Sequence, residues 1–235
     1  MPFRTHFKSP CFFSILCTLF AVGCAAPEES VRPGVNQEYQ ETPLPTWVER
    51  FESESREIYR ERERIARAAG IQEGMHVADV GAGTGIFVEI FAKAVGATGR
   101  VYAGDIKTEF VERIEKEARS RGLDNVTTVL GAERSANLPA GSIDLAFVCD
   151  TYHHFEYPRS MLASIRRALK PGGTLVIVDF ERIPGKSRAW VLDHVRAGKE
   201  EVIKEIEAAG FDLVDQPATP FLTENYLLRF RKKGR

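Results

Sequence analysis

The sequence lacks an excess of basic residues. Its 32 lysines and arginines are balanced by 33 aspartates and glutamates, and the formal net charge is −1. A protein that holds nucleic acid by its phosphates needs a surplus of positive charge on one face. The charge balance therefore argues against a nucleic acid partner and against a polyanionic substrate.

Cysteine is scarce too. Three of the four cysteines, Cys11, Cys17 and Cys24, lie in the first 24 residues, and only Cys149 belongs to the body of the chain. This distribution excludes a disulfide framework. The body also lacks any apolar run of about 18 residues, which excludes a membrane protein with several spans. The 235 residues, 43% of them hydrophobic, suffice for one globular domain with a packed core.

The N-terminus is arranged like a secretory signal. Arg4 and Lys8 precede a mostly apolar stretch, residues 11–22, which is too short to span a membrane comfortably. We therefore expect residues 1–23 to be a signal peptide and the protein to be exported. The alternative is a cytoplasmic protein whose start codon is misassigned.

The end of this segment adds a lipid signal. The small residues Ala21 and Gly23 directly before Cys24 resemble the lipobox of bacterial lipoproteins. The resemblance implies that Cys24 is the first mature residue and is acylated, so that the protein is periplasmic and anchored to the membrane. Ordinary cleavage and an uncleaved anchor are the alternatives.

The next segment, residues 24–46, is rich in proline and polar groups. Such a composition buries too little apolar surface to fold alone. We expect a flexible linker here and a single folded domain over residues 47–235. The residues that favour the linker are Pro27, Pro33, Gly34, Pro43 and Pro45.

The body of the chain alternates strands with helices. A helix is expected first, over residues 47–69 with Gly70 as its stop signal. Short β-rich runs then alternate with helical patterns, so the connections are crossovers and the sheet is parallel. The expected strands are 76–80, 101–105, 126–130, 143–149 and 174–180, and the helices between them are 86–95, 108–121 and 159–169.

The C-terminal part departs from this alternation. A helix over residues 199–209 is followed by two strand patterns, 211–214 and 225–230. Pro217 and Pro220 between these strands forbid a helical crossover, so the last two strands are expected to pair antiparallel. The predicted fold is a doubly wound α/β sheet, whose ligands bind at the carboxyl ends of the strands.

Polar and glycine residues follow the first three strands. Asp79 is followed by Gly81, Gly83 and Gly85, a spacing that lets the backbone turn sharply and approach a ligand. A tight turn without a ligand explains this loop equally well. A dinucleotide fingerprint would need glycine where Ile86 stands, so NAD is disfavoured.

Two further positions favour a nucleoside. Asp105 ends the second strand, 20 residues after Gly85, where a carboxylate can accept hydrogen bonds from both ribose hydroxyls. After the third strand, Ala132 and Glu133 could meet an adenine ring and its amine, although an exposed loop acid is an equal alternative for Glu133.

Three motifs in order resemble the class I S-adenosylmethionine-dependent methyltransferases. They are VADVGAGTG at residues 77–85, VYAGDI at 101–106 and LKPGGTLVIVDF at 169–180. The resemblance implies a Rossmann-like sheet of seven strands in the order 3-2-1-4-5-7-6, the last strand antiparallel, with helices on both faces. It implies S-adenosylmethionine as the cofactor. The residues expected to bind it are Asp79, Gly81 and Gly83 at the methionine part, Asp105 at the ribose, and Ala132 and Glu133 at the adenine, together with Gly85 and Asp150.

The loop after the fourth strand, residues 149–155, is expected to face the methyl acceptor. It lacks the [DN]-P-P-[YF] motif of enzymes that methylate exocyclic or amide nitrogens, and its His-His-Phe run resembles methyltransferases of small molecules. His153 or His154 is the expected general base. The alternative for this pair is helix capping or pairing with Asp150. His194 is a weaker candidate, more often structural on an amphipathic segment.

No metal site is expected, because two adjacent histidines should not point at one ion without backbone distortion and Cys149 should be buried. Cys149 is expected to be a core residue rather than a nucleophile. The sequence thus predicts a methyltransferase that moves a methyl group to a small-molecule acceptor by in-line displacement. The alternative is an exported, non-catalytic nucleoside-binding or structural lipoprotein. Nothing in the sequence indicates the oligomeric state.

Overall fold

The computed structural model of the protein describes Met1 and residues 27–234. Apart from Met1, the predicted signal peptide lies outside the described residues, as does Cys24 with its expected acylation. Within the part that is described, no helix is both long and apolar enough to cross a membrane.

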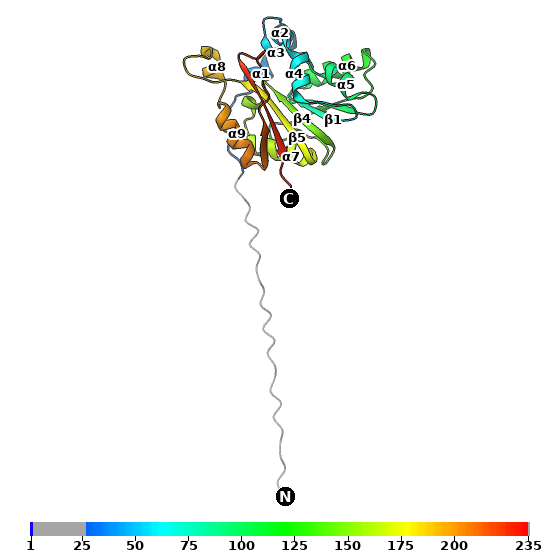
Figure 1. The fold of residues 1–235 in the computed structure, drawn as a ribbon, viewed down its shortest axis with the longest axis vertical. Coiled ribbons are helices and arrows are strands. Elements are labelled where there is room, and N and C mark those ends of the chain that lie inside the picture. The colour runs from blue at the N-terminus through cyan, green and yellow to red at the C-terminus, as the bar shows by residue number, and fades with distance from the viewer. Residues whose placement is uncertain (2–26, 235) are drawn as a thin grey trace.

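One sheet of seven strands forms the centre of the molecule (Figure 1). Its order is β3-β2-β1-β4-β5-β7-β6, which confirms the predicted fold class. The first five strands are parallel, and β7 pairs antiparallel with both β5 and β6. The strands are β1 (His76–Val80), β2 (Arg100–Asp105), β3 (Val126–Leu130), β4 (Ile143–Cys149), β5 (Leu169–Phe180), β6 (Phe211–Asp215) and β7 (Asn225–Lys232).

Helices cover both faces of this sheet. Successive residues of a strand point to opposite faces, and the two core clusters divide along this alternation. Val77 of β1 packs in the cluster with α4 (Arg62–Ala69) and α5 (Val88–Val95). Its neighbour Ala78 packs in the cluster with α7 (Pro158–Ala168) and α9 (Lys199–Ala208). Helix α6 (Thr108–Ser120) packs on β2 and β3.

The predicted helix over residues 47–69 is wrong as a single element. The structure has α2 (Leu44–Phe51), α3 (Glu57–Arg60) and α4, with an irregular turn between α2 and α3. Ser53 accepts the backbone N–H of Ser55 in this turn, and serine side chains that bond the backbone locally compete with helix. The break lets the buried Glu57 carboxylate accept the backbone N–H groups of residues 223–225, where β7 begins.

The predicted linker is also wrong for residues 27–46, which fold against the domain. Helix α1 (Gln37–Glu41) lies in this segment, and the buried Lys107 ammonium donates to three carbonyl oxygens at its end. Nearer the N-terminus, the Glu28 carboxylate accepts the backbone N–H groups that begin α7. Polar contacts from the domain hold a segment whose own composition could not fold it.

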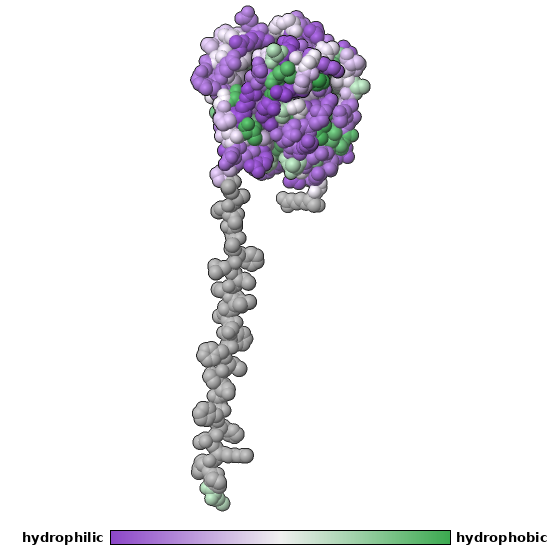
Figure 2. Space-filling model, turned by 90° about the vertical axis from the view of Figure 1, so that its left-hand side faces the viewer, coloured by the Kyte–Doolittle hydropathy of each residue, from purple (hydrophilic) through white to green (hydrophobic). Residues whose placement is uncertain are grey.

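Helices α1, α2 and α3 gather at one end of the sheet, with α8 (Ala189–His194) beside them (Figure 1). The face of the molecule on the side of α8 and α9 is mostly hydrophilic, with small apolar areas between polar ones (Figure 2). Two of the exposed large apolar side chains, Ile183 and Trp190, belong to the α8 region.

Candidate active site

A cavity of about 910 Å³ opens at the carboxyl ends of β1, β2 and β4. Pockets for small molecules commonly measure about 300–1,000 Å³. Its walls come from the glycine loop after β1, from helices α1 to α3, from the loop after β4 and from α8. The predicted site residues that line it are Asp79, Gly81, Gly83, Asp105, Ala132, Glu133, Asp150, His153 and His154.

The glycine loop has backbone conformations that side chains would disturb. Gly81 has a φ of +80°, and a Cβ there would collide with the Thr151 side chain. Gly85 has a φ of +88°, and a Cβ there would lie 2.9 Å from Ile114. Both glycines are therefore required by the turn itself. Gly83 faces the cavity, where its missing side chain leaves room beside the Phe51 ring.

Asp79 is a buried carboxylate on the cavity wall, and its Oδ2 atom has no hydrogen-bond partner in the described structure. Burial and the neighbouring charge of Asp105 raise the pKa of Asp79 to about 8. A buried carboxylate without a partner is costly. A ligand with a positive charge at this position would satisfy it.

Asp105 is buried on the next strand, and both of its oxygens are hydrogen-bonded. Its Oδ1 accepts the backbone N–H of Lys107, and its Oδ2 accepts the backbone N–H of Gly83 and the hydroxyl of Tyr39, each at 2.9 Å. Burial raises the pKa of Asp105, while these three hydrogen bonds oppose the rise. The Tyr39 hydroxyl thus donates to the carboxylate that the sequence predicted to bind the ribose hydroxyls.

Aromatic side chains close this end of the cavity. The Tyr39 ring lies 5.3 Å from the rings of Trp47 and Phe110, and Trp47 lies 4.9 Å from Phe51. None of them was predicted as a site residue, because they come from a segment that was expected to be a linker and from helix faces.

Ala132 and Glu133 are exposed at the rim of the cavity, where a β-bridge between Ala132 and Ser135 shapes the loop. Asp150 lies deeper, with a φ of +47°. Arg56 and Asn225 hydrogen-bond its two carboxylate oxygens at 2.7 and 2.6 Å. The Asp150 carboxylate therefore holds the wall together, and its contact with a cofactor stays a prediction.

The two adjacent histidines lie on a short 3₁₀ turn, η1 (Tyr152–His154). His153 is buried, and its Nδ1 donates to Oδ1 of Asp179 at 2.7 Å. Its backbone N–H donates to the other Asp179 oxygen. Asp179 near the end of β5, and not Asp150, is therefore the carboxylate that orients His153. Asp179 belongs to the motif at residues 169–180, and its position near the end of a strand could have marked it as a site residue.

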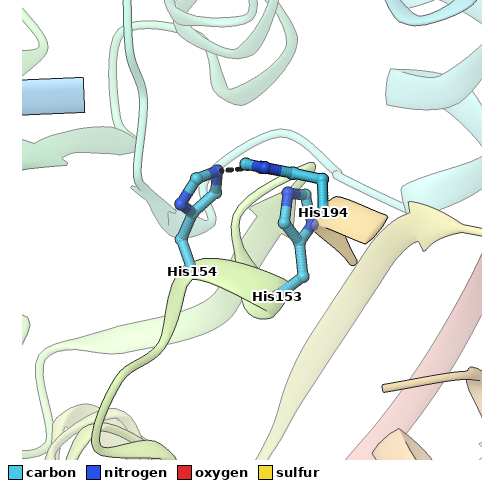
Figure 3. A group of neighbouring side chains, drawn as sticks. All are labelled: His153, His154 and His194. Carbon is cyan, nitrogen blue, oxygen red and sulfur yellow. Dashed lines mark hydrogen bonds between the residues drawn. The ribbon is translucent and has the colours of Figure 1, made fainter. Parts of the chain in front are cut away.

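His194, the weakest candidate in the sequence, joins this pair from α8. Its Nε2 lies 3.2 Å from Nε2 of His154 (Figure 3). Burial lowers the pKa of His154 well below its usual range and that of His194 to about 4, so both imidazoles are neutral at physiological pH. The Trp190 ring stacks on His194 with centroids 4.7 Å apart. The sequence did not predict that His194 lies beside His153 and His154, because helix α8 was not predicted.

The sequence predicted that adjacent histidines would not point at one ion without backbone distortion, but the 3₁₀ turn η1 brings both close to His194. The tight turn places the rings of His153 and His154 with centroids 4.4 Å apart, and ring nitrogens of both approach His194. Cys149 behaves as expected, because it packs on the core and burial raises the pKa of its thiol well above the usual range.

Residues 78–177 match a family described as a methyltransferase domain. The chain is 34% identical over 119 residues to a ubiquinone/menaquinone biosynthesis C-methyltransferase of Bordetella parapertussis. It is 31% identical over 122 residues to the protein of the same name from Pseudoalteromonas translucida. These matches cover 51% and 52% of this chain, and 45% and 48% of the relatives. The chain thus spans about half the length of the curated relatives it matches.

Solved structures give a wider match. A SAM-dependent methyltransferase from Aquifex aeolicus aligns with a TM-score of 0.70 and 26% identity over 81% of this chain and 99% of its own. The [4+2]-cyclase SpnF aligns with a TM-score of 0.63 and 18% identity, over 74% of this chain and 80% of its own. At 18% identity the second likeness shows the fold alone.

Proposed function

We propose that this chain, whose fold is that of the class I S-adenosylmethionine-dependent methyltransferases, transfers a methyl group from S-adenosylmethionine to a small-molecule acceptor. The methyltransferase domain match and the Aquifex aeolicus neighbour support S-adenosylmethionine as the cofactor. The comparisons do not specify the acceptor, so its chemical class is argued from the site and from the names of the curated relatives.

One observation carries the proposal. Asp79 presents an unpartnered buried carboxylate oxygen beside the glycine loop, and Asp105 stands at the adjacent strand end in the same cavity. S-adenosylmethionine carries an ammonium and a sulfonium at one end and ribose hydroxyls in the middle. The cationic end would satisfy Asp79, and a ribose hydroxyl would bind Asp105 beside the Tyr39 hydroxyl or in its place.

The cofactor carboxylate fits the glycine loop. The backbone N–H groups between Gly83 and the start of α5 precede a helix, and the N-terminal end of a helix favours an anion. Ala132 and Glu133 at the rim are proposed to meet the adenine, as the resemblance implies.

When bound, the cofactor supplies an electrophilic methyl group on sulfur. The protein's part in an in-line displacement is to align the acceptor with that group and to exclude water. The aromatic residues Tyr39, Trp47 and Phe51 close the cofactor half of the cavity, which favours both tasks.

His153 and His154 are proposed to act on the acceptor. An acceptor hydroxyl or an acidic C–H must lose a proton before or during methyl transfer. A neutral imidazole nitrogen can take this proton or can hold a metal ion that promotes its loss. The curated relatives are named C-methyltransferases of ubiquinone and menaquinone biosynthesis, which favours an acceptor that is methylated at carbon.

The experiment uses S-adenosylmethionine with a labelled methyl group. The full chain is incubated with it and with a small-molecule extract of the source organism, and the label is followed into low-mass products. We expect the wild type to transfer the label and Asp105→Ala not to transfer it. The control Asp212→Asn, which changes an exposed residue on β6, should transfer it like the wild type. If the protein binds the cofactor and no label moves, the non-catalytic binder is favoured instead.

A further inference from the structure

Three of the five histidines meet at one point of the cavity. His153 and His154 come from η1, and His194 comes from the end of α8, so elements about 40 residues apart in sequence contribute to the cluster (Figure 3). One ring nitrogen of each lies within 4.8 Å of the others. Such a group of three imidazoles is either a packed hydrogen-bonded cluster or a set of metal ligands.

The spacing of the nitrogens suits a metal. Two imidazole nitrogens bound at about 2.0–2.1 Å to one tetrahedral ion lie about 3.3–3.4 Å apart. The Nε2 atoms of His154 and His194 are 3.2 Å apart. This separation is close to that of two nitrogens bound to one ion, and the His153 ring lies 5.2 Å from the His194 ring.

The surroundings orient two of the three rings, those of His153 and His194. A histidine ligand usually donates its second ring N–H to a carboxylate, which fixes the tautomer and leaves the other nitrogen free to bind. Asp179 does this for His153, because it accepts from Nδ1 at 2.7 Å. Stacking on Trp190 fixes the ring of His194, and the Phe180 ring packs 5.8 Å from that of His153.

The charges at the cluster are compatible with a cation. The nearest carboxylate is that of Asp179, while the Arg32 guanidinium is engaged with the backbone oxygens of Asp193 and His194.

We propose that His153, His154 and His194 bind one divalent transition-metal ion, with Zn²⁺ the best match to the donor set. Imidazole nitrogen suits zinc, copper, nickel and iron, and three protein ligands with a fourth position left open are the arrangement of catalytic zinc. All three histidines line the cavity that also holds Asp79 and Asp105, so a ligand in that cavity could reach the open position.

The role of the ion rests on the proposed function. An acceptor hydroxyl bound at the open position loses its proton to solvent more easily, because the ion stabilises the oxyanion. An electron pair from this activated acceptor then forms the new bond to the methyl carbon while the carbon–sulfur bond breaks. That bond's electron pair stays on sulfur, and S-adenosylhomocysteine leaves. In this form the histidines are ligands, and the ion replaces a general base.

The test is a titration of the full chain, purified in mild detergent and stripped of metal, with Co²⁺ followed by its visible absorption and displaced by Zn²⁺. His194→Ala is the main variant, because His194 is half-buried at the end of a short helix. The matched control is His76→Gln, which removes a histidine whose ring bonds the Ser142 carbonyl outside the cavity. Every protein keeps all four cysteines, so thiol binding cancels in the comparison.

We expect the wild type and His76→Gln to bind one equivalent, His194→Ala and His154→Ala to bind at least about 100-fold more weakly, and Asp179→Asn to bind about 10–100-fold more weakly. Cu²⁺ bound to the wild type should show coupling to three imidazole nitrogens in its electron paramagnetic resonance spectrum. The proposal is overturned if a His194→Ala protein that melts like the wild type still binds the metal as tightly as the wild type. It is also overturned if the wild type binds no metal. Metal binding without any binding of S-adenosylmethionine would leave the site standing and remove the proposed function.

Discussion

Asp79 is a carboxyl group whose charged form the fold disfavours. Its pKa is about 8 in the folded chain, against 3.8 for an ordinary aspartate, because it is buried beside Asp105. The folded chain therefore keeps this proton over a pH range in which the unfolded chain has lost it, so this group lowers stability as pH rises from about 4 to about 8.

Asp79→Asn removes this penalty. We expect the unligated variant to gain stability over the wild type as pH rises from 5 to 8, by roughly 1–3 kcal/mol, or about 2–4 °C in Tm for each kcal/mol. Its affinity for S-adenosylmethionine should fall at the same time. Thermal melts at several pH values check the first part, and a difference in Tm that is independent of pH would contradict the assigned pKa.

Gly81 tests the close packing behind the glycine loop. Gly81→Ala and Gly122→Ala both place a side chain at positive φ, but only the first one collides with a neighbour, Thr151. Strain at positive φ alone costs about 1 kcal/mol, and the collision adds to it. We expect Gly81→Ala to lower Tm clearly more than Gly122→Ala, and equal losses would show that the loop relaxes freely.

The strand-end residues were predictable because each follows a short apolar run directly. Asp79 and Asp105 end buried parallel strands, and this pattern alone places both at one edge of the sheet. The sequence named His194 only as a weak candidate and did not indicate Tyr39, because no pattern in it shows that α8 or α1 folds over that edge. Their places depend on contacts between distant residues.

At the scale of elements, Lys107 links the cofactor half of the cavity to helix α1. Its backbone N–H binds Asp105, and its buried ammonium donates to the carbonyl oxygens of Tyr39, Gln40 and Thr42 at 3.2, 2.8 and 2.7 Å. Lysine also suits the end of a helix, where the carbonyl groups carry partial negative charge.

Lys107→Met should release this segment. Three carbonyl groups lose a charged donor, which costs roughly 1–3 kcal/mol. We expect faster hydrogen exchange over residues 36–46, with the sheet still protected, whereas Lys116→Met on the exposed face of α6 should exchange like the wild type. Unchanged exchange in residues 36–46 of Lys107→Met would mean that aromatic packing alone holds α1.

The predicted and observed helix bounds show how far a local pattern of apolar residues predicts a helix. The helices between parallel strands were close to their observed bounds, because each carries a regular apolar face. The expected helix over residues 47–69 failed because Glu57 turns inward to hold the loop before β7, a contact across more than 160 residues. A periodic pattern contains no information about such a partner.

At the scale of the whole molecule, the location of the protein is a proposal from sequence. We propose that residues 1–23 direct export and that Cys24 carries a lipid anchor. We expect Cys24→Ser to move the protein from the membrane pellet to the soluble fraction, with Cys149→Ser as the matched control. A Cys24→Ser protein that still sediments with membranes would contradict lipidation at this residue.

The central claim concerns the cavity as a whole, which joins a cofactor half at Asp79 and Asp105 to three histidines. The most direct measurement is calorimetric titration of the full chain with S-adenosylmethionine and S-adenosylhomocysteine, with NAD as a control ligand and Asp105→Ala and Asp212→Asn as variants. The account predicts that the wild type and Asp212→Asn bind both adenosyl ligands and not NAD, and that Asp105→Ala loses this binding. Folded wild-type protein that binds neither adenosyl ligand would contradict the account.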